Sequence, residues 1–404
     1  MARPRLIVAV DVGTTKVLAL AAAQEGEHLS LAASGVAPCA ALRRGVVVDM
    51  EAAASAISQA IAPLLSALGP RLPGAWVGVT GAHLASANLQ GGVGVAAPEA
   101  GITRSEIDAA LQQAGGSVPL PSDREVVHAI PRSFAIDGQD GVRNPLGMSA
   151  RALEVSAHLV TGTTTLLDNL EQAVLRSGLM VEELVFEPIA AGHALLSAAE
   201  QDLGTLLVDI GGGTSDYALF ADGAVCHSGS VPLGGGQVTR DLAMALGADP
   251  AEAERLKVEH GHCLYQELPE EDEVSYHPLG GGEEQVSRRY LAGIIEARME
   301  EILRLVWAEA GKCEYASRLA GGLVLTGGSS RLPGIRTLAE RITGRPARSA
   351  RGQGVEADPE LLADPAWATG FGLLCYAAAQ ETAPQWQPRP RPWQWLLRVL
   401  RLGR

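Results

Sequence analysis

The sequence predicts an α/β protein with two similar lobes, and three glycine-rich blocks carry this prediction. Two of the blocks are near copies of each other, VDVGTTK at residues 10–16 and VDIGGGTSD at residues 208–216. Each lies between two short aliphatic runs, which indicates a strand, a glycine turn and a second strand. The third block, LVLTGGSS at residues 323–330, indicates a strand, a Gly-Gly turn and a helix. Two matching turns and one separate turn predict a nucleotide cleft between two halves.

The two matching turns have the residue types that bind phosphate and magnesium. Glycine lets the backbone N–H groups of a tight turn converge on one phosphate, and an Asp before the turn can hold magnesium directly or through water. Lys16 either reaches a phosphate as a point charge or points outward from its strand. Asp11 and Asp209 are the predicted metal-associated residues, and simple turn-forming Asp is the alternative. The predicted phosphate residues are Gly13, Thr14, Thr15 and Lys16 in the first turn and Gly211, Gly212, Gly213 and Thr214 in the second.

Other glycine motifs do not fit these blocks. A dinucleotide-binding fingerprint needs Gly-x-Gly-x-x-Gly at the start of a helix, but Asp216 stands where the last glycine should be. The residues that follow, Tyr-Ala-Leu-Phe, favour a strand. The Gly-x-x-x-x-Gly-Lys-Ser/Thr string of a P-loop does not occur. Two unrelated hairpins with glycine turns remain the alternative to a paired phosphate site.

Composition limits the possible partners and compartments. A chain of 404 residues is long enough for two or three domains. Its five cysteines form no Cys-x-x-Cys pair, which favours a reducing compartment and suggests no metal site. We expect no signal peptide and, without a run of eighteen apolar residues, no membrane span. The net charge is −14, but residues 384–404 hold five Arg and no acid. The acidic body argues against nucleic acid as a partner.

The three blocks resemble the phosphate-1, phosphate-2 and adenosine motifs of the actin/Hsp70/sugar-kinase superfamily. Within it, the chain is similar to the FtsA family of bacterial cell-division proteins, from about residue 6 to its last residue. This resemblance implies an α/β, actin-like (ribonuclease H-like) two-lobe ATPase fold with an FtsA-type inserted 1C subdomain and a C-terminal amphipathic helix. The matching stretches are VGVTGAH at 77–83, HAIPR at 128–132, NPLG at 144–147, VPLGGGQVTRDLA at 231–243 and AERLKVEHG at 253–261.

The resemblance also divides the chain into subdomains, and local patterns place several helices. Helices are predicted over residues 51–68, 103–114, 166–177 and 290–310, and another starting at Glu187, because apolar residues recur there at helical spacing or helix-start signals occur. Residues 258–282 are polar and are expected to form a solvated loop. The expected subdomains are the lobe I core (1A) at 1–83, 162–200 and 365–383, 1C at 84–161, the lobe II core (2A) at 201–245 and 320–364, and 2B at 246–319.

Further site residues follow from the resemblance. In hydrolytic relatives, the Glu that matches Glu187 positions the attacking water. Its alternative is a helix-start Glu favoured by the helix dipole, with Pro188 at the first turn. Glu254 and Lys257 share one helix face at i,i+3, and the matching pair touches ribose and adenine, with a surface salt bridge as the alternative. Gly327, Gly328 and Ser329 are expected at the nucleoside, Arg331 on adenine, and Gly235 and Gly236 beside the phosphates.

The C-terminal tail has the pattern of a membrane-surface helix after a spacer. Residues 384–392 contain four prolines and form an extended linker of about 28 Å at roughly 3 Å per residue. Residues 393–404 place Trp393, Leu396, Leu397 and Leu400 at i, i+3, i+4 and i+7. Trp395, Arg398 and Arg401 complete a helix suited to an anionic bilayer interface. A terminal helix docked on the body is the alternative.

The resemblance implies a function for the whole chain. It implies a protein that binds ATP and Mg²⁺, polymerises head to tail, and binds the FtsZ C-terminal tail with a lobe at residues 246–320. Other divisome proteins would bind residues 84–161, and the tail would hold the protein on the cytoplasmic face of the membrane at the division site. Hydrolysis is expected to be slow. The alternatives are a PilM-like pilus-assembly actin homologue and a sugar or acetate kinase-type phosphotransferase, although no acceptor-substrate Asp is evident.

Overall fold

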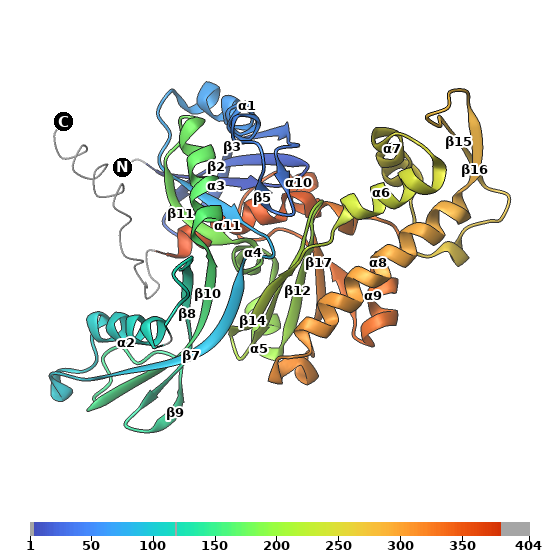
Figure 1. The fold of residues 1–404 in the computed structure, drawn as a ribbon. Coiled ribbons are helices and arrows are strands. Elements are labelled where there is room, and N and C mark those ends of the chain that lie inside the picture. Colours follow the sequence, from blue (N-terminus) through green and yellow to red (C-terminus); the bar gives the residue numbers. More distant parts are fainter. Residues whose placement is uncertain (1–3, 118, 381–404) are drawn as a thin grey trace. The chain divides into compact units, whose positions relative to one another are not determined.

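A computed structural model describes residues 4–117 and 119–380, which form two compact units. The smaller unit holds residues 87–161, and the larger unit holds the rest of the described chain. The chain enters the smaller unit within strand β7 (Ala85–Gly94) and leaves it within strand β10 (Ala152–Thr163). Figure 1 shows the course of the chain by colour.

Lobe I of the larger unit is built on a five-stranded sheet with the order β11-β6-β1-β2-β3. Strands β1, β2 and β3 are antiparallel neighbours, whereas β6 runs parallel to both β1 and β11. The tight turn between β1 and β2 is the first glycine block, so the predicted strand–turn–strand is confirmed. The strands are β1 (Arg5–Val12), β2 (Lys16–Glu25), β3 (His28–Pro38), β6 (Ala75–Val79) and β11 (Val181–Phe186).

Lobe II repeats this arrangement with a second five-stranded sheet of order β14-β13-β12-β17-β18. Strands β12, β13 and β14 are antiparallel, and β17 runs parallel to β12 and β18. The second glycine block joins β12 to β13, and the third follows β17, so the two halves are similar in topology as predicted. The strands are β12 (Thr205–Ile210), β13 (Ser215–Ala221), β14 (Ala224–Val231), β17 (Gly322–Thr326) and β18 (Ala347–Ser349).

Two buried helices join the lobes. Helix α4 (Glu187–Leu195) packs on β12, β13 and β14, and helix α11 (Ala368–Ala379) packs on β1, β2 and β6. The two helices also pack closely on each other. A Cβ added to Gly372 of α11 would lie 2.5 Å from the Cα of Ala191 on α4, so the contact is possible only with glycine there. Since α4 also packs on β11 of lobe I, it contacts both sheets, and its backbone meets that of α11 between them.

Other helices pack around the lobes. Helices α1 (Met50–Leu68) and α3 (Thr164–Arg176) belong to lobe I, and α6 (Gly235–Leu246), α8 (Arg288–Ala310) and α9 (Ile335–Thr343) belong to lobe II (Figure 1). The predicted helices over 51–68, 166–177 and 290–310 are therefore confirmed to within about two residues. Shorter elements are β4 (Leu42–Arg43), β5 (Val46–Val47), α5 (Ala198–Leu203), η3 (Glu314–Arg318), η4 (Gly328–Arg331), α10 (Pro359–Ala363) and η5 (Pro365–Trp367).

Helix α1 is the one helix in the described part of the chain that is long and apolar enough to cross a membrane. Its packing accounts for that composition. Ala53, Ile57, Ile61 and other residues of one face are buried, and the helix packs on β2, β3 and α3. A Cβ on Gly35 of β3 would lie 2.1 Å from the Ala60 carbonyl oxygen. The helix is thus packed against the lobe I sheet.

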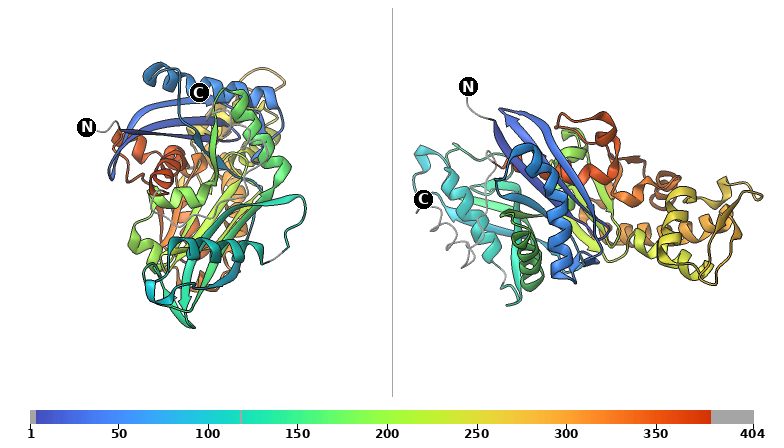
Figure 2. Two further views of the ribbon diagram at one scale, coloured as in Figure 1. Left: turned by 90° about the vertical axis from the view of Figure 1, so that its left-hand side faces the viewer. Right: turned by 90° about the horizontal axis from the view of Figure 1, so that it is seen from above.

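The region between α6 and α8 corrects one prediction. Residues 258–282, which were expected to be a solvated loop, contain the end of helix α7 (Pro250–His260), η2 (Tyr265–Glu267) and strand β15 (Glu273–Tyr276). Strand β15 pairs with β16 (Glu284–Ser287) in an antiparallel hairpin. This prediction was wrong because the apolar contacts of Val274 and Val286 with the lobe II core outweigh the polar composition. The yellow and orange segments of Figures 1 and 2 show α6, α7, α8 and the hairpin together.

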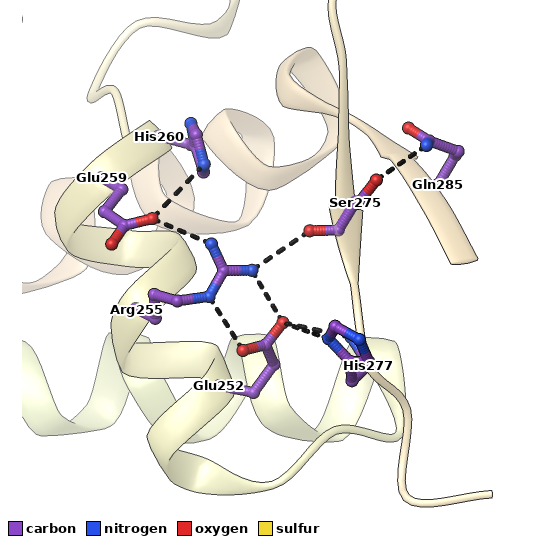
Figure 3. A network of polar contacts seen from close by, with 7 residues as sticks. All are labelled: Glu252, Arg255, Glu259, His260, Ser275, His277 and Gln285. Carbon is purple, nitrogen blue, oxygen red and sulfur yellow. Dashed lines mark hydrogen bonds and ion pairs between the residues drawn. The ribbon is translucent and has the colours of Figure 1, made fainter. Parts of the chain in front are cut away.

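An arginine network attaches this hairpin to α7. The Arg255 guanidinium donates to Glu252 at 2.7 and 2.9 Å, to Glu259 at 2.8 Å and to the Ser275 carbonyl at 3.1 Å (Figure 3). The hydrogen bonds from Arg255 hold the pKa of Glu252 at about 2. The backbone N–H of His277 also donates to Glu252, at 3.1 Å. One side of α7 is therefore fixed to the hairpin.

The smaller unit has a four-stranded sheet of order β7-β10-β8-β9 and one α-helix. Strand β8 spans Arg124–Ile136, β9 spans Gln139–Val142, and a short turn, η1, spans Pro98–Ala100. Helix α2 (Arg104–Gly116) begins with the predicted capping box, in which the Thr103 N–H and hydroxyl both donate to Glu106 at 2.8 Å. The apolar face of α2 packs with residues of β8 and β10 in a core of its own.

Candidate functional site

The two glycine turns of the larger unit face each other directly. A Cβ on Gly212 would lie 2.6 Å from Cγ2 of Thr15, and a Cβ on Gly213 would lie 2.5 Å from Oγ1 of Thr14. Each turn is closed in the same way, by N–H donation from its first glycine to a carbonyl three residues on, at 2.9 Å in the first and 3.0 Å in the second. The fold thus brings together the two stretches that the sequence marked as phosphate-binding.

Four acidic side chains are buried around these turns. Asp11 and Asp209 are the second-last residues of β1 and β12, Asp216 is the second residue of β13 and Glu187 begins α4. Each is less than one-tenth exposed. Burial raises the pKa of Asp11 to about 6, with Lys16 opposing the shift, and raises the pKa of Asp209 to about 7. Burial and the charges of the aspartates raise the pKa of Glu187 well above its ordinary value. Such a cluster favours the binding of protons or cations.

Glu187 points toward these acids. Its Oε1 atom accepts no hydrogen bond from the described residues, and a Cβ on Gly78 would lie 3.0 Å from it. Glu187 and Pro188 stand in the first turn of α4, so the alternative of a helix-start Glu favoured by the helix dipole also fits the structure. A buried carboxylate oxygen without a partner is costly unless a ligand or water completes it. The position is therefore compatible with a water-positioning role.

Asp216 was missed as a site residue, although it belongs to the second glycine block. Its Oδ2 accepts a hydrogen bond from the Thr214 hydroxyl at 2.8 Å and another from Thr80. The Thr80 and Thr214 hydroxyls are also within 3.0 Å of each other. Burial raises the pKa of Asp216 against these lowering hydrogen bonds. The available signal was its position in the block itself, as an acid two residues after Thr214 at the start of the second strand.

The residues present fit magnesium held partly by a nucleotide. The described residues contain no group of three or more His, Cys, Asp or Glu side chains able to hold a metal ion. Magnesium commonly uses one or two carboxylates and completes its six ligands with water and phosphate oxygens. Asp11 and Asp209, each at the end of a strand beside a glycine turn, can supply those carboxylates.

Lys16 points inward from β2. Its Nζ donates a hydrogen bond to the Ala366 carbonyl, so the outward orientation does not occur. Burial lowers the pKa of Lys16, and the charge of Asp11 opposes that shift. The ammonium group lies among the acids and can meet a phosphate.

On the lobe II side, Lys257 is buried and bonded to three acceptors. Its Nζ donates to Glu254 at 2.6 Å, to the Thr239 hydroxyl at 2.9 Å and to the Gly235 carbonyl at 3.2 Å. With 8% of its surface exposed, Lys257 is not half of a surface salt bridge. It fixes α7 to the start of α6. The N–H groups of Gly235 and of Gly236 donate to carbonyls of the second glycine turn at 2.9 and 2.7 Å, so these two glycines support that turn.

The third glycine block lies beside the second. The Ser329 hydroxyl donates to the Gly211 carbonyl at 3.2 Å. Gly327 has φ 84°, and a Cβ there would lie 2.3 Å from Oδ1 of Asp209, so only glycine fits. Gly328, next in the block, has open space where a Cβ would lie. Arg331, expected on adenine, pairs with Asp364 at 2.8 Å.

A second candidate site is a groove on α8, away from the glycine turns. Its volume is about 550 Å³. Apolar and aromatic surfaces are joined there by two arginines, each of which also has a carboxylate partner in the described chain. The lining residues are Asp241, Tyr265, Arg289, Tyr290, Gly293, Ile294, Ala297, Arg298 and Glu301. The predicted linker at 384–392 and the tail helix at 393–404 lie outside the described residues.

Comparison with known proteins gives the family. A family model described as Cell division protein FtsA matches residues 206–372, and a second, SHS2 domain inserted in FTSA, matches residues 81–161. Cell division protein FtsA of Pseudomonas aeruginosa is 36% identical over 381 residues, covering 94% of this chain and 90% of the relative. The chain belongs to the FtsA family of cell-division proteins. The FtsA of Bacillus subtilis is 32% identical, covering 92% of this chain and 83% of that relative. The FtsA resemblance of the sequence is thereby confirmed.

Solved structures place the FtsA family chain in the actin-like fold. The PilM-PilN type IV pilus biogenesis complex matches with a TM-score of 0.66 at 18% identity, over 91% of this chain and 97% of that one. MreB5 of Spiroplasma citri bound to ADP matches with a TM-score of 0.55 at 15% identity, over 94% of this chain and 97% of that one. At these identities the match shows the fold alone. The predicted actin-like fold with an inserted subdomain is confirmed.

Proposed function

We propose that this protein binds ATP with Mg²⁺ between its two lobes, polymerises head to tail and tethers FtsZ filaments to the cytoplasmic face of the cell membrane at the division site. One observation supports the nucleotide-binding part of this proposal. Two matching glycine turns meet over four buried acids, an arrangement that is costly without a ligand that brings both phosphate and a cation.

Each residue of the site has a role in this proposal. The N–H groups of the glycine turns that do not close the turns themselves, with the Thr14 and Thr15 hydroxyls, hold the phosphates, and Lys16 adds a positive charge. Asp11 and Asp209 hold Mg²⁺, which neutralises phosphate charge when bound. Glu187 orients a water molecule toward the terminal phosphate. Gly327 and Ser329 line the part of the site that holds the nucleoside. The nucleotide acts mainly as a conformational ligand, and hydrolysis is slow.

The α8 groove supports a site for the C-terminal tail of FtsZ. Tyr290 and Ile294 offer apolar contacts. Arg289, which pairs with Glu270 and lies 5.7 Å from the Tyr265 ring centre, places a positive charge in the groove. Peptide anchors commonly combine aromatic pockets with arginine. The groove lies within the lobe for which the family resemblance implies this partner.

The remaining partners follow from family membership and the tail sequence. Residues 84–161 are proposed to bind other divisome proteins, and a second copy of the chain adds to the filament. Residues 393–404, with two Trp and three Arg, bind an anionic membrane surface through the 384–392 linker. No role in binding nucleic acid is proposed.

Calorimetry tests the nucleotide part of this proposal. ATP is titrated into the full-length protein with Mg²⁺ and with EDTA, and the same titrations are made with Asp209→Ala. The wild type is expected to bind more tightly with Mg²⁺, and the variant is expected to lose that difference. Equal affinity for ATP in the two proteins would refute the assignment. Incubation with ATP and candidate sugars separates the phosphotransferase alternative, because only a kinase yields a phosphorylated sugar.

A further inference from the structure

One short segment outside the glycine blocks touches all three of them. Residues 364–369 run from η5 into the first turn of α11. Lys16 of the first block donates to the Ala366 carbonyl, and the Gly327 N–H of the third donates to the Pro365 carbonyl at 3.1 Å. Asp209 of the second block accepts a hydrogen bond from Thr369 at 2.6 Å. The segment has no glycine motif of its own, and its role is visible only in the folded chain.

The contact between Thr369 and Asp209 is the most direct of these. Thr369 is 5% exposed and lies in the first turn of α11, and its hydroxyl donates to Oδ2 of Asp209. The other carboxylate oxygen, Oδ1, faces Gly327 closely enough to leave no room for a Cβ. The carboxylate is thus held on both sides, by a donor on α11 and by the turn after β17.

We infer that Thr369 is a positioning residue that orients the Asp209 carboxylate for magnesium. Through this hydrogen bond, binding of a nucleotide stabilises the first turn of α11. This inference rests on the proposed ATP·Mg²⁺ function. Outer-sphere hydrogen bonds of this kind fix the direction of a ligating carboxylate, and their loss commonly lowers metal affinity about 10- to 100-fold.

The packing of α11 shows how binding of a nucleotide would affect residues beyond Asp209. Helix α11 contacts α4 at Gly372 and Ala191 without space for a side chain, and α4 begins at Glu187. Thr369 and Glu187 therefore stand near the site on two helices that touch backbone to backbone. A nucleotide that fixes Asp209 fixes Thr369, and the first turn of α11 becomes less free to open.

A matched pair of substitutions tests the inference. Thr369→Val keeps the shape of the side chain and removes the hydroxyl donor, whereas Thr369→Ser keeps the donor. Both full-length variants are titrated with ADP in Mg²⁺ and in EDTA. We expect Thr369→Val to bind about tenfold more weakly in Mg²⁺ with unchanged affinity in EDTA, and Thr369→Ser to resemble the wild type.

Hydrogen exchange gives a readout that does not depend on activity. In wild type and Thr369→Ser, Mg·ADP is expected to slow amide exchange in peptides covering residues 364–376, and Thr369→Val should lose this protection. A wild type whose affinity is independent of Mg²⁺ would contradict the proposed function itself. A wild type with strong Mg²⁺ dependence and a Thr369→Val variant that keeps it would overturn the inference alone. Equal weakening in Mg²⁺ and EDTA, with a lower melting temperature, would also overturn it, since Thr369 would then be only a packing residue.

Discussion

Lys257 and Gly235 are joined across lobe II by a hydrogen bond of 3.2 Å from the buried ammonium group to the glycine carbonyl. Gly235 begins α6, and its own N–H supports the second glycine turn. The Lys257 ammonium group on α7 therefore donates a hydrogen bond to the backbone that supports the proposed phosphate site. The opposite side of α7 is held to the β15–β16 hairpin by Arg255, so the helix is fixed from two sides (Figure 3).

Lys257→Met is expected to destabilise the protein by about 1–3 kcal/mol, because it removes the three hydrogen bonds that the buried ammonium group donates. Lys312→Met provides the matched control. Lys312 pairs with Glu309 at 2.6 Å and i,i+3, the same distance and spacing as Lys257 with Glu254, but its side chain is 64% exposed. The control should cost about 0.5 kcal/mol or less. Urea unfolding of both variants measures the difference, and equal losses would show that burial of Lys257 contributes nothing.

Asp209→Asn is expected to stabilise the nucleotide-free protein at alkaline pH. The pKa of Asp209 is raised to about 7 in the folded state from 3.8, so the unfolded chain loses this proton at lower pH than the folded chain. The contribution of Asp209 to the free energy of unfolding is complete below about pH 4. It falls as the pH rises toward 7 and is lost above pH 7. Asparagine stays neutral and avoids the loss.

Thermal melts in EDTA at pH 5 and pH 8 check this sign. The melting temperature of Asp209→Asn should exceed that of the wild type by about 2–4 °C or more at pH 8, and by less at pH 5. Asp222→Asn, at an exposed turn position, should show no such dependence. A variant that is less stable than wild type at pH 8 would mean that the Asp209 charge is compensated in the folded state.

Glu187→Gln is expected to lower ATP hydrolysis at least about tenfold while leaving ATP affinity nearly unchanged. The carboxylate has an unpartnered oxygen among the buried acids, and a residue that orients water acts mainly in the transition state. Phosphate release under saturating ATP and calorimetry measure the two quantities. Unchanged hydrolysis in the variant would assign Glu187 a structural role.

Tyr290→Ala is expected to weaken binding of the FtsZ C-terminal peptide about tenfold or more, since an aromatic anchor is lost from the α8 groove. Leu305→Ala is the control, because Leu305 is also an exposed apolar residue on α8 but does not line the groove. Fluorescence anisotropy with a labelled peptide gives both affinities. Equal effects of the two substitutions, or crosslinks from the peptide only to residues 84–161, would place the site elsewhere.

Deletion of residues 393–404 is expected to release the protein from anionic vesicles without changing its melting temperature. Leu400→Glu should act like the deletion, because it places a charge on the apolar side of the predicted helix, whereas Gln394→Glu should have a smaller effect. Arg398→Ala should matter mainly at low salt, where screening is weak. Vesicle co-sedimentation and a melt are the measurements. Truncated protein that still sediments, or melts much earlier, would favour a docked structural helix.

The glycine blocks predicted much of the fold because each combines a local turn with flanking strand patterns. Asp11 and Asp209 were predicted as metal-associated in this way, since a strand end beside a glycine turn has a recognisable sequence. Thr369 has no such sequence pattern, because its proposed role depends on a contact with a residue 160 positions away. The β15–β16 hairpin was missed for a related reason. Its polar strands are held by Arg255 and by contacts with the lobe II core, and tertiary contacts of this kind leave little trace in a local window.

The absence of a side chain at Gly372 makes the crossing of α4 and α11 a pivot. Backbone against backbone, the two helices can change their angle but cannot slide past each other without losing contact. Movement of one lobe against the other therefore has to keep or break this contact together with the contacts between the two glycine turns. A methyl group at that point would act as a wedge between the lobes, and the glycine turns that now face each other would be held apart.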